Sequence, residues 1–146
     1  MNRRTVTNFF AATLALAVLN GCSMGSALSL YDQLGGMGQL SRLSGNMMGS
    51  LIKNPSMAGL LSNIDMTGAT GQVSDQLCAA LGGGCAAPFS ADQIASAANK
   101  LNPTQQQAVS DSFGSALSAV TDSPDLQKAI NKSVGSQLSG IVGALL

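Results

Sequence analysis

The chain has 146 residues with seven basic and seven acidic side chains, and it contains neither histidine nor glutamate. This balanced, scattered charge excludes the basic surface that nucleic-acid-binding proteins use. Without histidine, the commonest general base and metal ligand is missing, and only dispersed aspartates remain for acid–base chemistry. The length suits a single domain. Because aromatic residues are few, its core has to be built from aliphatic side chains, methionine and alanine.

Residues 1–22 have the organisation of an export signal. Arg3 and Arg4 make the start positive, and an apolar stretch follows from Phe9 to Leu19. That stretch is shorter than the roughly 20 apolar residues that a bilayer-spanning helix needs. A charged start, a short apolar segment and a small residue before the cleavage point are typical of a secretory signal.

The segment ends in Leu19-Asn20-Gly21-Cys22, which resembles the bacterial lipobox. The resemblance implies diacylglycerol on the Cys22 sulfur, cleavage after Gly21, and acylation of the new amino group, as by palmitate. Two such lipid signals anchor a protein stably to a membrane. Ser23 follows the cysteine where retained lipoproteins carry aspartate, which implies an outer-membrane lipoprotein that faces the periplasm. An ordinary signal peptide with an incidental cysteine is the alternative.

After a tether formed by residues 22–28, helical spacing begins. A short helix is expected at Leu30–Leu34, with two glycines directly after it. The next helix shows one buried face, because apolar residues recur at spacings of three and four up to Asn54-Pro55, which ends it. These residues are Leu40, Leu43, Met47 and Leu51. A short apolar turn follows at residues 57–61.

Two further helices are predicted around the pair of cysteines in the middle of the chain. The first covers about 71–81, with Val73, Leu77 and Leu81 on one side. The second begins after Ser90, because a serine followed three residues later by glutamine forms a capping box, and it runs through about residue 98.

Asn-Pro and Ser-Pro pairs mark the start of the last two helices, at Asn102-Pro103 and Ser123-Pro124. The first of them has an apolar face made of Val109, Phe113, Leu117 and Val120. The second carries one apolar stripe made of Leu126, Ile130, Val134, Leu138, Ile141 and Leu145. No segment alternates as a strand would, so the sequence predicts an all-α domain over residues 29–146.

Cys78 and Cys85 are seven residues apart, which would be about 10.5 Å along one continuous helix. A disulfide needs its Cα atoms within roughly 7 Å. The three glycines at 82–84 break the helix, so the chain can turn back and bring the two sulfurs together. Since an exported protein reaches an oxidising compartment, we predict a Cys78–Cys85 disulfide. Two free thiols are the alternative.

Several motifs, in the same order and with similar spacing, resemble those of group I truncated haemoglobins. These motifs are Leu30-Tyr31-Asp32-Gln33-Leu34-Gly35-Gly36, Asn54-Pro55, Asn63-Ile64-Asp65-Met66, Leu81-Gly82-Gly83 and Asn102-Pro103-Thr104-Gln105. Exported relatives of that family have a similar loop with two cysteines around the glycines. The resemblance covers nearly all of residues 29–146, and it implies a truncated globin-like helical sandwich that follows an N-terminal signal helix over residues 1–21.

The family's haem-holding positions have changed in this chain. The resemblance places Ser96 at the proximal histidine, Met48 at the distal tyrosine, and Leu60-Leu61 at the two phenylalanines that cover the haem. A serine hydroxyl is not a usual haem ligand. A methionine thioether does bind haem iron, so methionine ligation stays an alternative, although methionines at helical spacing commonly fill a core. The methionines that could take part are Met47, Met48, Met57 and Met66.

These observations predict a lipid-anchored, truncated-globin-like periplasmic protein that acts as a non-catalytic binding or interaction module. No cofactor and no metal are expected, and haem binding with gas chemistry is the alternative function. The expected partners are the membrane, through Cys22, and an apolar small ligand or a protein of the cell envelope. A hydrolase is disfavoured, because no histidine or glutamate is present to activate one of the many serines.

Overall fold

The computed structural model describes residues 28–146, so the predicted signal peptide, the lipidation site Cys22 and most of the tether lie outside the described residues. Within the described range the chain is helical and contains no β-strand, which confirms the all-α prediction. In chain order the elements are α2 (Leu30–Leu34), α3 (Met37–Lys53), α4 (Pro55–Leu61), α5 (Met66–Ala80), α6 (Ala91–Ala97), the 3-10 turn η1 (Ala98–Lys100), α7 (Pro103–Val120), α8 (Pro124–Val134), the 3-10 turn η2 (Gly135–Gln137) and α9 (Leu138–Leu145).

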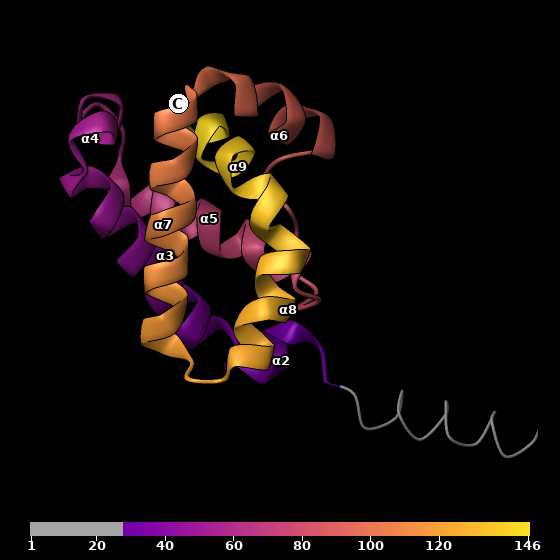
Figure 1. The fold of residues 1–146 in the computed structure, drawn as a ribbon. Helices are drawn as coiled ribbons and strands as arrows, with labels where there is room; N and C mark the ends of the chain where they lie inside the picture. The colour runs from indigo at the N-terminus through magenta and orange to yellow at the C-terminus, as the bar shows by residue number, and fades with distance from the viewer. Residues whose placement is uncertain (1–27) are drawn as a thin grey trace, which may run out of the picture.

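The helices form a sandwich of two layers (Figure 1). Helix α3 packs extensively against both α7 and α5, and α5 crosses behind the α3–α7 pair. Helices α8 and α9 follow the far side of α7, while α6 lies across one end of the molecule on top of α9. Among residues 28–146 we find no helix that is both long enough and apolar enough to cross a membrane.

Side-chain caps set most helix boundaries where the sequence predicted them. Asn54 ends α3 and starts α4, and its Oδ1 accepts hydrogen bonds from the Ser56 amide at 2.9 Å and the Ser56 hydroxyl at 2.6 Å. Helix α6 begins with the predicted capping box, and α7 begins with a second one, between Asn102 and Gln105. The Gln105 Nε2 also donates to the Ser56 carbonyl oxygen at 3.1 Å, so one cap residue joins α7 to α4.

Three predicted elements differ from the structure. The apolar turn expected at residues 57–61 is the helix α4, which already starts at Pro55 because Asn54 caps it. Helix α5 begins at Met66, not near residue 71, because the Asp65 side chain accepts from the Thr67 amide at 3.2 Å and caps a turn that has little apolar periodicity. The predicted single last helix is broken by η2 into α8 and α9. In α9 both Ile141 and Val142 are buried. The helix therefore buries a wider face than the single apolar stripe that the sequence predicted.

The core is aliphatic, as predicted from composition, with Phe113 as its one fully buried aromatic side chain among the described residues. All four apolar positions of the α3 face are buried without accessible surface, and three of the four predicted for α7 are buried. Val120 is the exception, because it lies half-buried at the last residue of α7. Burial of these faces is the main stabilising contribution, since the hydrophobic effect scales with the apolar area removed from water.

Candidate functional site

The disulfide predicted between Cys78 and Cys85 is present, with its Cα atoms 5.6 Å apart. Gly82 and Gly84 both adopt positive φ, which lets the chain turn back from α5. Gly83 lies between the two, where an added Cβ would overlap both the Cys78 sulfur and the Tyr31 ring. The loop therefore needs small residues at these positions.

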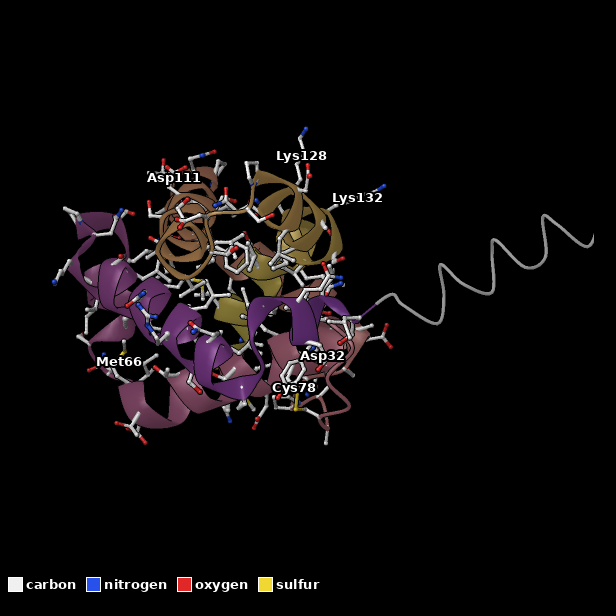
Figure 2. The ribbon with its side chains drawn as sticks, turned by 90° about the horizontal axis from the view of Figure 1, so that it is seen from below. Asp32, Met66, Cys78, Asp111, Lys128 and Lys132 are labelled. Carbon is white, nitrogen blue, oxygen red and sulfur yellow. A yellow bond between two sulfur atoms is a disulfide. The ribbon has the colours of Figure 1, made fainter. Side chains whose placement is uncertain are left out.

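The disulfide loop also holds α2 against the end of α5. The Tyr31 amide donates to the Leu81 carbonyl oxygen at 3.0 Å, and the Gly83 amide donates to the Cys78 carbonyl oxygen at 2.8 Å. Figure 2 shows the disulfide beside α2 and close to Asp32, while Met66 lies at the opposite end of α5. Cys78 is buried and Cys85 is half-buried, so the bridge joins the core to the surface loop.

The four positions that the resemblance assigned to a haem pocket do not face one common cavity. Met48 on α3 and Leu61 on α4 are buried, with 1% and 0% of their surface accessible. Leu60 is exposed, as is Ser96 on α6. Ser96 lies in a surface hollow of about 410 Å³ beside Asp92 and Lys100.

The interior around Met48 is filled by protein atoms. A side chain with no surface accessible to water lines no cavity that could hold even one water molecule. This applies to apolar side chains from several helices, among them Met47, Leu61, Val73, Leu77, Val109, Phe113 and Ile141. It applies equally to Ser44 on α3, whose Oγ is fully enclosed and has no hydrogen-bond partner among residues 28–146.

Helix α6, which carries Ser96, is packed directly onto α9. A Cβ added at Gly140 would overlap the Ile94 carbonyl oxygen, and one added at Gly143 would overlap the Ala97 carbonyl oxygen. The backbones of α6 and α9 are therefore in contact at two points one helical turn apart. This contact leaves Ile94 and Ala97 on the inner side of α6 and Ser96 on its solvent side.

The methionines considered as ligands do not gather at an open site. Met47, Met48 and Met57 have at most 1% of their surface accessible and belong to the core, as methionines at helical spacing commonly do. Met66 is half-buried at the start of α5. Within residues 28–146 there is also no group of three or more cysteine, aspartate, glutamate or histidine side chains that could hold a metal ion.

A cavity of about 580 Å³ lies between the end of α5, the loop that follows it, α6 and η2. Its walls are mainly alanine, and Gln76 reaches it from α5 with 5% of its own surface accessible. The Gln76 Oε1 accepts a hydrogen bond from the Phe89 amide at 3.0 Å, which holds the loop against α5. No prediction from the sequence included Gln76, although a glutamine three residues after Val73 on the apolar side of a helix is an unusual feature that could have identified it.

No protein-family model matches this chain, and no curated protein sequence matches it. Solved structures do resemble it. A truncated haemoglobin from Tetrahymena pyriformis, a point mutant in the Fe(III) form, superposes with a TM-score of 0.67 at 17% identity, covering 78% of this chain and 97% of the other. The 2/2 haemoglobin from Synechococcus sp. PCC 7002, with covalently attached haem, superposes with a TM-score of 0.66 at 21% identity, covering 79% and 98%. The described chain therefore has the truncated-globin fold, as predicted.

The residues at the four positions that the resemblance assigns to a haem pocket do not fit a haem. The chain contains no imidazole, Ser96 faces solvent, and Met48 and Leu61 open onto no cavity. A haem placed among them would have to displace core side chains that are already in contact, and cores tolerate added volume poorly.

Proposed function

We propose that this protein is a truncated-globin-fold binding module that has lost haem, performs no catalysis, and is held at a membrane by lipid on Cys22. The observation that carries the proposal is the closed interior: the positions of the former ligands and covering residues are either packed into the core or turned to solvent. A fold that keeps its architecture while filling its cofactor site serves a function that needs its surface or another cavity.

A non-catalytic role is supported by the distribution of ionisable groups. All seven aspartates of the described residues are exposed, and the chain has no histidine or glutamate. Catalytic carboxylates are commonly placed in clefts, where burial or a charged neighbour shifts their pKa toward the working pH. Aspartates that are exposed and dispersed over the surface are poor candidates for general acids or bases.

A haemin titration tests the loss of haem binding. We expect residues 22–146 with Cys22→Ser to give no saturable Soret shift while their circular dichroism shows a folded helical protein. The matched variant Ser96→His supplies an imidazole at the proximal position, and we expect it to bind no haem either, because this side chain faces away from the interior.

A sharp Soret shift of the unmodified chain would instead favour the alternative function. The similar solved structures include proteins whose descriptions name Fe(III) and covalently attached haem, so haem binding is the natural competitor. Loss of that shift on Met48→Leu, and its retention on Met66→Leu, would identify the buried methionine as the ligand.

Lipid attachment has its own test. In bacterial cells supplied with labelled palmitate, we expect the full chain to incorporate label and to fractionate with the outer membrane, since two acyl chains anchor a protein stably. The Cys22→Ser variant should incorporate none, whereas Cys85→Ser should incorporate as much as the unmodified chain. Release of an unlabelled protein into the periplasm would contradict lipidation and leave only an ordinary export signal.

A further inference from the structure

The cavity between α5, α6 and η2 has walls that suit an uncharged ligand. No aspartate, lysine or arginine lines it. Six alanines do so, from α5, the loop, α6 and η1: Ala79, Ala80, Ala87, Ala91, Ala95 and Ala98. The other lining residues are Gln76, Phe89, Ser90, Ile94 and the serine and glutamine of η2. Its volume of about 580 Å³ falls within the range of small-molecule sites in proteins.

The cavity exists because small side chains cover two helices that are held apart. Contact with α9 fixes the position of α6 from one side, through Gly140 and Gly143. The loop after α5 is held by the disulfide and by the hydrogen bond from the Phe89 amide to Gln76. The alanine side chains on α5 and α6 are too short to fill the space between these two helices, so the cavity follows from the packing of the fold.

Gln76 supplies one directed polar group inside the apolar walls. Its Oε1 is occupied by the Phe89 amide, which fixes the orientation of the side-chain amide. Its Nε2 donates no hydrogen bond within residues 28–146. Among the side-chain polar atoms of that range, only the Ser44 Oγ is both fully enclosed and without a partner, so the Nε2 is not fully enclosed. The Nε2 therefore keeps some accessible surface, and Gln76 is one of the residues that line the cavity.

We propose that this cavity binds a neutral small molecule with an apolar body and a hydrogen-bond acceptor, whose oxygen accepts from the Gln76 Nε2. The inference rests on the proposed function as a binding module, and it names the site and the class of ligand. A charged ligand would find no oppositely charged side chain in these walls to offset the partial desolvation of its charge. A purely apolar ligand would leave the Nε2 unpaired, whereas a carbonyl, ester or ether oxygen satisfies it.

Benzophenone is a suitable probe, because it combines two apolar rings with one carbonyl acceptor and inserts into nearby C–H bonds under light. The full chain, purified in a non-ionic detergent, is irradiated with increasing benzophenone, and adducts are located by peptide fragmentation. We expect saturable labelling at residues 76–80 and 89–98. Excess fluorenone, a neutral ketone of similar shape, should compete.

Variants on different walls test the location. Ala95→Phe and Ser136→Trp both fill the cavity from exposed positions, and we expect each to reduce saturable labelling at least 10-fold. The matched control Ala119→Phe adds the same bulk at an exposed position on α7 and should leave labelling unchanged. Gln76→Glu keeps an oxygen for the Phe89 amide and removes the donor, so apparent affinity should fall about 3- to 10-fold at neutral pH.

Labelling that stays non-saturable, or that survives both cavity-filling substitutions, would overturn the site. Equal affinity of Gln76→Glu and the unmodified chain would overturn the role of the Nε2. Neither result bears on haem, which the haemin titration decides separately, so failure of this site and failure of the proposed function can be told apart. Melting of each variant, followed by circular dichroism, verifies that its helices remain folded.

Discussion

Replacing both Gly140 and Gly143 by alanine should lower the free energy of unfolding by about 3 kcal/mol. Each new methyl group would overlap a backbone carbonyl oxygen of α6, that of Ile94 or that of Ala97. A carbonyl in a helix cannot rotate away as a flexible side chain can, so α6 has to move as a unit. Urea unfolding followed by far-ultraviolet circular dichroism measures the loss.

Two other glycines provide matched controls with the opposite expected sign. Gly45 on α3 and Gly114 on α7 are interior to their helices, and an added Cβ meets nothing within 4 Å at either position. Alanine there should raise the free energy of unfolding by about 0.5–1 kcal/mol, since it has the higher helix propensity. If all four substitutions stabilise the protein alike, the close contact of α6 with α9 does not exist in solution.

Removing the disulfide by Cys78→Ala together with Cys85→Ala should cost about 2–3 kcal/mol of unfolding free energy. The bridge closes a short loop with a sequence separation of 7, so it restricts the unfolded chain only moderately. In a small aliphatic core this is still a large share of the total, because single domains are stable by about 5–15 kcal/mol.

Reductant gives the matched comparison for the disulfide. It should lower the melting temperature of the unmodified protein and leave that of the double variant unchanged. Amide exchange supplies a local readout: the Tyr31 amide, which donates to the Leu81 carbonyl oxygen, should exchange faster once the loop is free. A melting temperature that does not respond to reductant would show that the glycine turns and core contacts hold the loop without the bridge.

The close contact between α6 and α9 has a consequence for function. It leaves Ile94 and Ala97 on the inner side of α6 and Ser96 on the solvent side, and the cavity is lined from α6 by Ala91, Ile94 and Ala95. Ser96, the position that the resemblance assigns to the proximal histidine, is therefore exposed and lines neither the core nor the cavity. This arrangement supports the proposal that a ligand binds in the cavity and not at the position that the resemblance assigns to the proximal histidine.

Local rules were sufficient for most helix starts. Asn54, Ser90 and Asn102 each carry a side-chain oxygen that satisfies free amides of the first turn, and that interaction involves residues only two or three apart. The start of α5 was missed because its first turns contain glycine and threonine, which show no apolar periodicity. The only local signal for this start is the Asp65 side chain, which caps the helix. The disulfide was predictable because Cys78 and Cys85 are only seven residues apart and the glycines between them let the chain turn back.

The sequence by itself determined that this protein is all-α, that its core is aliphatic, that Cys78 and Cys85 pair, and that no imidazole is available for iron. Those properties depend on composition and on contacts between residues near each other along the chain. Only the tertiary structure decided that the positions assigned by resemblance to a haem pocket are divided between core and solvent. It also decided that Gln76 faces an alanine-lined cavity, because both facts depend on how closely α6 approaches α9 and how far it stays from α5. Helix spacing of this kind is set by side chains distant in sequence, whose packing no local pattern records.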